Sequence, residues 1–280
     1  MWQGSSRREA PARAAAASLA SLIVLAGCGT LSIPQERKLG EDANRQIRQQ
    51  VKLLRDRVVH DYVANVGAEL VVAAGPQPFE YEFYVVEDDQ INAFALPAGF
   101  IYVHTETILK ARNVSELAGV VGHEVGHVAR RHIAQNYNRQ RNTGILHQVA
   151  VIGAGVAGGS AAAGAVNLLG GVAGVAYLNT FGREAEADAD AFAVEVLPRA
   201  GYDPRGLVSF FDTLAREGGA GGPSFLSSHP APKDRIQATS ARIAAAHLPP
   251  NLEVSDGGRL EIIQQRIRLL VGESGSGSKR

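Results

Sequence analysis

Residues 113–128 read Asn-Val-Ser-Glu-Leu-Ala-Gly-Val-Val-Gly-His-Glu-Val-Gly-His-Val, and this stretch decides how the chain folds. Asn113 can cap a helix, Glu116 follows three residues later as in a capping box, and the apolar residues recur at three-to-four spacing. The pattern predicts an amphipathic helix that begins after Asn113 and runs to about Gln135.

The predicted helix carries two histidines, His123 and His127, with Glu124 between them. Residues four apart project from one helical face, so both imidazole rings can bind one zinc ion at about 2.0–2.1 Å. Glu124 lies about 100° round the helix, beside the ion, where it can accept a proton from water. The alternative is a surface helix with two solvated histidines, but the small apolar flanks predict a buried face. A buried His-Glu-His cluster without a metal would be costly.

A catalytic zinc site has three protein ligands, so a third must lie elsewhere in the chain. Charges return at Arg183 after a long uncharged stretch and predict a second helix to about Val196. Within it Glu186 and Asp190 share one face, as a carboxylate ligand and a second carboxylate that holds a ligand histidine require. Glu184 is a rival for the third ligand.

The other elements predict an α+β fold that is mainly helical. Three-to-four spacing predicts packing helices around 36–55 and 61–72. Two strands are expected at 81–86 and 100–103, with a turn-rich segment at 92–99 between them. A small sheet therefore precedes the motif helix.

Residues 1–27 have the anatomy of a secretory signal peptide, a basic start followed by an apolar stretch too short to span a bilayer. The segment ends in Leu25-Ala26-Gly27-Cys28, which resembles a bacterial lipobox, in which the cysteine becomes the first mature residue and carries the lipid. Cys28 is the only cysteine, so no disulfide is possible. Gly29 after the cysteine, by resemblance to lipoprotein sorting signals, favours the outer membrane. The alternative is an ordinary signal peptide with a chance cysteine.

Bulk composition argues against nucleic acid as a partner, because the formal net charge is zero and aromatic residues make up only 6% of the chain. Residues 153–158 match the G-x-G-x-x-G pattern, but the acidic residue expected about 20 positions later is missing, so no dinucleotide cofactor is expected. The surrounding 142–182 segment is interpreted as a Gly/Ala-rich helical pair that covers the active site, with a membrane-inserting hairpin as the alternative.

Five motifs together resemble a known family, the zinc metallopeptidases of the CaaX prenyl protease, HtpX and BepA type (metallopeptidase family 48). The similarity covers about Ile33 to Ala245. The motifs are Asn92–Pro97, the His-Glu-x-x-His helix, Arg183-x-x-Glu186-x-x-x-Asp190, Ala200–Pro204 and Ser228-His229-Pro230-x-Pro232-x-Asp234-Arg235. One departure is Ala98, which stands where the family usually has glycine.

The resemblance implies a zincin-like (gluzincin) domain at 28–250, followed by a C-terminal helix and disordered tail at 251–280. In the family, the carboxylates of the second helix lie at a fixed spacing before the Ala200-Gly201-Tyr202 motif. That spacing selects Asp190 as the carboxylate that holds a ligand histidine, and so Glu186 as the third zinc ligand. Asn92, Ala93 and Phe94 are expected at the cleft edge, where a peptide can add as an extended strand, although Phe94 also fits a core position.

His229 is the candidate second donor for the oxyanion, beside the metal and the base Glu124. In similar proteins a histidine at this position can instead occupy the open zinc position and hold the enzyme latent, and a solvated loop histidine is a third interpretation.

We therefore expect a zinc endopeptidase, lipid-anchored through Cys28 on the periplasmic side of a bacterial envelope membrane, that cleaves misfolded or unassembled envelope proteins. By resemblance, the outer-membrane assembly machinery is an expected partner. Two rival classes are a non-catalytic zinc-containing lipoprotein that acts as a chaperone or scaffold, and a zinc hydrolase of non-peptide bonds.

Overall fold

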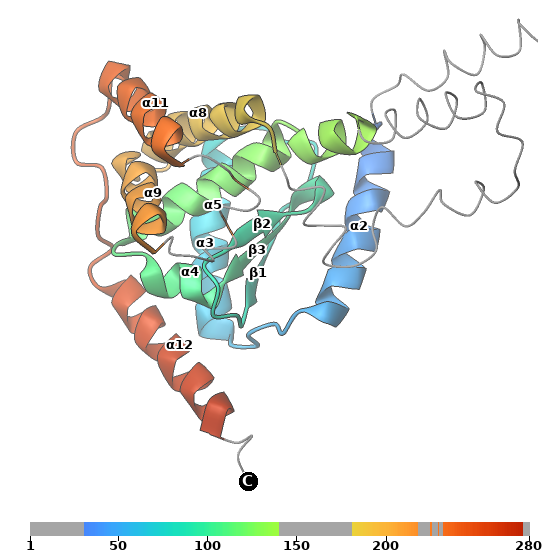
Figure 1. Ribbon diagram of the computed structural model, residues 1–280, viewed down its shortest axis with the longest axis vertical. Coiled ribbons are helices and arrows are strands. Elements are labelled where there is room, and N and C mark those ends of the chain that lie inside the picture. The colour runs from blue at the N-terminus through green and yellow to red at the C-terminus, as the bar shows by residue number, and fades with distance from the viewer. Residues whose placement is uncertain (1–30, 140–180, 218–224, 226–228, 230–231, 277–280) are drawn as a thin grey trace, which may run out of the picture.

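The computed structural model describes residues 31–139, 181–217, 225, 229 and 232–276 (Figure 1). Within them the chain is mainly helical, with one small three-stranded sheet. The mainly helical α+β class expected from the sequence is confirmed. The expected signal peptide with Cys28, and the 142–180 part of the Gly/Ala-rich segment, lie outside the described residues.

The sheet contains the strands β1 (Glu82–Val86), β2 (Ala93–Ala95) and β3 (Phe100–His104), in the order β1-β3-β2. β1 runs parallel to β3, and β2 runs antiparallel to it. β1 and β3 were expected as strands, whereas β2 lies at the start of the segment between them that was expected to be turn-rich at its end. The chain returns from β2 to β3 through the short 3₁₀ turn η1 (Pro97–Gly99), inside which Ala98 has a φ of 66°.

Helices cover both faces of this sheet (Figure 1). α3 (Arg57–Ala73) packs on one face, where a Cβ added to Gly67 would lie only 2.2 Å from the ring of Phe83. α2 (Ile33–Gln50) covers the other face, and its buried side chains pack with Tyr102 of β3 in a separate apolar cluster. The sheet is thus a middle layer between α2 on one side and α3 and α5 on the other.

The boundary between α2 and α3 differs from the expectation of one helix to Arg55 and another from Asp61. The backbone of residues 52–54 pairs with the end of β1, since the N–H of Leu54 donates to the carbonyl of Val85 over 2.9 Å. Backbone groups that pair with a strand cannot also hydrogen-bond within a helix, so α2 ends earlier than expected. α3 begins as soon as this pairing stops.

The motif helix, α5 (Val114–Ala129), follows β3 and the short helix α4 (Thr105–Lys110). Asn113 caps α5 as expected, by accepting a hydrogen bond from the N–H of Glu116 over 3.0 Å. The side chain of Glu116 accepts from the N–H of Arg112 instead of completing a capping box. α5 is buried along nearly its whole length, so it forms the centre of the core.

The expected continuation of this helix to Gln135 is wrong. α5 ends at Ala129, and Arg131 has a left-handed backbone conformation with a φ of 57°. A tertiary contact accounts for the bend, because Nε of Arg131 donates to the buried carboxylate of Glu36 on α2 over 2.7 Å. Residues 132–139 then form a separate helical segment.

Within the described residues, the second half of the chain contains the helices α8 (Arg183–Arg199), α9 (Arg205–Glu217), α11 (Pro232–Ala245) and α12 (Arg259–Ser276). Glycines allow α8 and α9 to approach α5 closely: a Cβ on Gly126 would lie 3.2 Å from the carbonyl oxygen of Ala189 in α8, and one on Gly119 would lie 2.8 Å from the backbone of Leu207 in α9. α11 packs against both α8 and α9 (Figure 1).

α12 packs into the same core as α3 and α5 through Leu260, Ile263 and Ile267. It extends to Ser276, so the expected C-terminal helix occupies most of the 251–280 range. Among the described residues, none of the helices combines the length and the apolar character that crossing a membrane requires.

Candidate metal centre

The two motif histidines face each other inside the protein. His123 and His127 are fully buried one turn apart on α5, and their Nε2 atoms lie 3.0 Å apart. Their rings are nearly perpendicular, with an interplanar angle of 81°. The two nitrogens therefore converge on one small space, as ligands of a single ion do.

Glu186 of α8 faces the same space. Its Oε2 lies 3.5 Å from Nε2 of His123, and its Oε1 lies 3.5 Å from Nε2 of His127. The rival carboxylate, Glu184, is exposed to solvent. α8 is held against α5 at Gly126, so the close packing of the two helices brings Glu186 to the histidines.

His229 joins this group from the segment before α11. Its ring is fully buried and stacks on Phe225 with the centroids 4.4 Å apart, and its Nδ1 lies 2.9 Å from Oε1 of Glu186. One potential ligand atom from each of His123, His127, Glu186 and His229 lies within 4.8 Å of the others. His229 is therefore not a solvated loop histidine.

Glu124 lies beside the group. Its side chain is buried, and within the described residues its Oε1 makes no hydrogen bond and lies 3.5 Å from Nε2 of His229. Burial raises the pKa of Glu124 above its ordinary value, although the nearby histidines oppose this shift. A carboxylate with a raised pKa is suited to accept and return a proton near neutral pH.

Asp190 holds the ring of His123 from the side away from Glu186. Its Oδ1 lies 2.9 Å from Nδ1 of His123, which leaves Nε2 of that ring for a metal. The guanidinium of Arg235 donates to both oxygens of Asp190, over 2.8 and 2.6 Å, and lies 2.8 Å from Oε2 of Glu186. Burial raises the pKa of Asp190, but the hydrogen bonds from Arg235 and His123 outweigh it and bring this pKa to about 2.

The donor set fits a divalent metal ion. Burial would raise the pKa of Glu186, but the histidines around it hold this pKa well below its usual range, so the carboxylate is ionised. Burial lowers the pKa of His127 well below its ordinary value, which keeps the ring neutral and its lone pair available. Neutral imidazole nitrogens and a carboxylate are ligands that zinc prefers.

The predicted substrate-binding residues lie on the edge strand β2 and just before it. The ring of Phe94 stacks on Tyr102 with the centroids 4.9 Å apart, on the sheet face that α2 covers, so it faces away from α5. The carbonyl of Asn92 accepts from the N–H of His104 over 2.9 Å. In an antiparallel ladder the backbone groups of the next residue, Ala93, then point to the outer edge of the sheet.

Arg235 was part of a quoted motif, but sequence reasoning gave it no role. Its partner Asp190 is 45 residues away in the chain, and no spacing rule connects α8 with α11. Arginine in a stretch of mainly small and polar residues is usually solvated, and only the packing of the two helices shows that this one is buried.

His132 and Asp188 were missed altogether. Nδ1 of His132 lies 3.1 Å from Nδ1 of His127, and Nε2 of His132 lies 3.2 Å from Oδ2 of Asp188. The available signal was a third histidine five residues after His127. An uninterrupted helix would have placed it about 140° round the axis from His127, too far for this contact.

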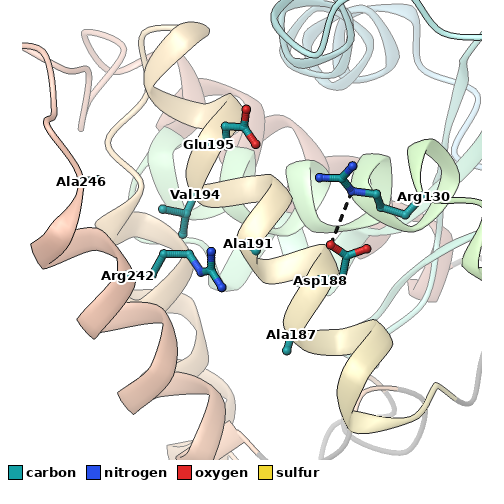
Figure 2. A pocket seen from close by; sticks show the side chains of 8 residues that line it. All are labelled: Arg130, Ala187, Asp188, Ala191, Val194, Glu195, Arg242 and Ala246. Atoms are coloured by element: carbon teal, nitrogen blue, oxygen red, sulfur yellow. Dashed lines mark ion pairs between the residues drawn. The ribbon is translucent and has the colours of Figure 1, made fainter.

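Asp188 opens onto a surface pocket between α8 and α11 (Figure 2). Figure 2 shows its ion pair with Arg130 at the end of α5, where Nε of Arg130 lies 3.5 Å from Oδ1 of Asp188. The Asp188 side chain is 46% exposed, whereas His132 is buried behind it. Solvent therefore reaches this chain of contacts at Asp188.

Comparison with known proteins gives a family match. A family model described as peptidase family M48 matches residues 57–243, a range that contains the motif helix, Glu186 and His229.

Three curated bacterial proteins are similar to the chain. A putative beta-barrel assembly-enhancing protease of Vibrio cholerae is 33% identical over 228 residues, which are 79% of this chain and 46% of that protein. The beta-barrel assembly-enhancing protease of Escherichia coli K12 is 32% identical over 225 residues, with the same shares. The metalloprotease LoiP of that strain is 30% identical over 170 residues, 60% of this chain and 64% of LoiP. The chain spans about half the length of the first two relatives.

Proposed function

Since this chain belongs to peptidase family M48, we propose that it is a zinc-dependent endopeptidase of the bacterial cell envelope. One observation carries the proposal: Glu124 faces the buried group of His123, His127 and Glu186 with an oxygen that no described residue hydrogen-bonds. A purely structural metal site has no use for such a carboxylate at its edge. The rival function, a non-catalytic zinc-containing lipoprotein that serves as a chaperone or scaffold, leaves this feature without a purpose.

In the proposed site one zinc ion is held by His123, His127 and Glu186, while Asp190 orients His123 and Arg235 orients Asp190. Bound zinc would supply a Lewis acid that polarises the scissile carbonyl and lowers the pKa of water. The buried positions of the ligands exclude bulk water from their other sides, which strengthens each electrostatic contact in the site.

Glu124 is the proposed general base. It accepts a proton from the attacking water and returns it to the nitrogen of the leaving amine, so that one carboxylate serves both halves of the reaction. Its burial supports this role, because a raised pKa makes the protonated form accessible during turnover.

His229 has two proposed roles that its position supports differently. As an oxyanion donor it would stabilise the tetrahedral intermediate together with the metal. As a latency residue it would occupy the open ligand position and withdraw when a peptide enters. Its Nδ1 is within the ligand group and 2.9 Å from Glu186, which favours the latent role for the arrangement described above.

We propose that a peptide adds as an extended strand to the outer edge of β2, toward which the backbone groups of Ala93 point. Main-chain recognition is tolerant of sequence, which suits misfolded or unassembled envelope proteins as substrates. The names of the relatives connect them with β-barrel assembly, and we extend to this chain an association with the outer-membrane assembly machinery.

Lipid attachment at Cys28 is proposed to hold the enzyme on the periplasmic face of the outer membrane. The support is the Leu25–Cys28 lipobox and the glycine that follows it.

The experiment that tests the proposal uses purified residues 29–280 and casein as an unfolded substrate. Zinc-loaded enzyme should cleave casein, a chelator should stop cleavage, and added zinc should restore it. His229→Ala separates the two roles of that residue: a faster rate than wild type supports latency, and a slower rate supports oxyanion stabilisation. Zinc-loaded protein that cleaves in neither form would contradict the peptidase and favour the non-catalytic lipoprotein.

A further inference from the structure

The two metal-facing histidines are held from behind in different ways. Nδ1 of His123 meets the carboxylate of Asp190 directly, over 2.9 Å. Nδ1 of His127 instead meets another imidazole, Nδ1 of His132, over 3.1 Å. The ring of His132 is itself buried, and its Nε2 lies 3.2 Å from Oδ2 of Asp188. A chain of contacts therefore runs from His127 through His132 to Asp188.

The protons in this chain have one consistent arrangement if His127 binds a metal through Nε2. His127 must then carry its own proton on Nδ1, and that N–H can donate only to a lone pair. His132 supplies the lone pair on its Nδ1, so its proton is on Nε2, where it donates to the carboxylate of Asp188. Each ring nitrogen between the metal space and solvent then has a defined role.

We propose that His132 is a positioning residue of the metal centre, which fixes the tautomer and ring orientation of His127 and connects this ring to Asp188. The inference rests on the proposed function, because it takes His127 to be a metal ligand. In this arrangement α8 supplies one ligand, Glu186, and both carboxylates that orient the ligand histidines, Asp190 directly and Asp188 through His132.

The geometry of α8 explains why an intermediate ring is needed. Residues four apart share a helical face, so Asp190 lies on the same side of α8 as Glu186 and reaches His123. Asp188 lies about 200° round the helix from Glu186, on the side of the surface pocket seen in Figure 2, and cannot reach His127 itself. His132 fills the distance between them.

The bend after α5 places His132 in that position. On a continuous helix His132 would lie about 140° round the axis from His127. The left-handed conformation of Arg131, with a φ of 57°, turns the chain back so that the ring of His132 faces His127. The contact of Arg131 with Glu36 on α2 holds this bend in place.

The competing explanation is that His132 only fills space at the edge of the His127 ring, in the way that Phe181 stacks on its face with the centroids 3.9 Å apart. Two substitutions separate these roles. His132→Phe keeps a ring of similar shape but has no hydrogen-bonding atom. His132→Asn loses part of the ring but places its amide oxygen near the position of Nδ1, where it can still accept from His127.

The test is the zinc affinity of the purified full chain, stripped of metal and titrated in competition with a chromophoric chelator. We expect His132→Phe to weaken zinc binding by about 10–100-fold and His132→Asn to remain closer to wild type. If His132 only fills space, His132→Phe should instead bind zinc more tightly than His132→Asn. The absorption spectrum of the Co²⁺-loaded proteins gives a second readout, because a misoriented His127 changes the ligand field, and His132→Phe should alter it more than His132→Asn.

Matched controls come from an exposed pair and from the far end of the chain of contacts. His60 lies next to Asp61 with Nδ1 3.1 Å from its Oδ1, and it is 46% exposed, so His60→Phe and His60→Asn should leave zinc affinity unchanged. Asp188→Ala should weaken binding, whereas Arg130→Ala, which removes only the other partner of Asp188, should not.

Unfolding of each metal-free variant is measured alongside. If His132→Phe does not fold, Asp188→Ala keeps the test decisive, because the Asp188 side chain is partly exposed and its removal disturbs the core less. Equal affinity of wild type and a folded His132→Phe, or equal effects of Asp188→Ala and Arg130→Ala, would overturn the inference and leave the proposed function intact. Failure of wild type itself to bind zinc would overturn both.

Discussion

Replacement of Arg235 by methionine should lower the free energy of unfolding of the metal-free protein by about 3–5 kcal/mol. Arg235 is only 7% exposed. Its guanidinium donates to both oxygens of Asp190 over 2.8 and 2.6 Å and lies 4.3 Å from the ring centroid of Phe211. Methionine preserves much of the apolar contact with Phe211 but removes the positive charge. Asp190 and Glu186 would then be buried carboxylates that have lost a shared counter-charge, and such a loss is far more destabilising than removal of an exposed pair.

The assay is urea unfolding followed by circular dichroism, in the presence of a chelator. Arg199→Met is the matched control, because Arg199 pairs with Glu195 at the same 2.6 Å, but both side chains are about half exposed. This control should lose at most about 1 kcal/mol. If Arg235→Met lost no more than Arg199→Met, the reasoning that burial makes this ion pair essential would be refuted.

Three further predictions concern packing, backbone strain and pH. Gly119→Ala should destabilise the protein by about 1–3 kcal/mol in the same urea titrations, since its Cβ would lie 2.8 Å from the backbone of Leu207. Gly122→Ala should stabilise the protein by about 0.5–1 kcal/mol, because the nearest contacts of its Cβ would lie at 3.8 Å. Ala98→Gly should raise the melting temperature, because relief of the left-handed conformation at φ 66° is worth about 1 kcal/mol, and a lower melting temperature would contradict this. Burial lowers the pKa of His104 below 6.5, so the unfolded chain binds the proton more readily and the stability of the folded protein falls with acidification below pH 6.5. His104→Asn should therefore lose less stability than the wild type between about pH 7.5 and 5.5. An equal loss in the two proteins would argue against this contribution of His104.

The ligand set could be predicted because it depends mostly on local helical geometry. His123 and His127 share a face of one helix whatever the rest of the chain does, and Glu186 and Asp190 share a face of another. The resemblance to a family predicted that these two helical faces meet. The residues alone could not decide between Glu184 and Glu186 as the third ligand. The burial of Glu186 and the exposure of Glu184 now agree with the family spacing.

The parts that could not be predicted depend on contacts between distant segments. The end of α5 is set by Arg131 and Glu36, which are 95 residues apart, and neither Gly nor Pro marks the bend. The early end of α2 depends on backbone pairing between residues 52–54 and β1. Helical periodicity carries no information about such pairings, so the tertiary structure overrides it.

The structure explains why the family usually has glycine at the position of Ala98. This residue has a φ of 66° and is followed by Gly99 with a φ of 106°, so the turn between β2 and β3 uses two consecutive positive φ angles. A family preference for glycine at Ala98 is what such a turn requires. The resemblance to the family marked this position as unusual, and the backbone conformation explains why.

The most direct test of the central claim compares casein cleavage by residues 29–280 of the wild type with cleavage by Glu124→Gln, at equal and measured zinc content. The substitution keeps the size of the side chain and removes its ability to accept a proton. We expect both proteins to hold one zinc ion per chain and only the wild type to cleave, with activity in Glu124→Gln reduced by at least about 100-fold. Cleavage by Glu124→Gln at the wild-type rate would contradict the role of Glu124 as the base and with it the proposed mechanism.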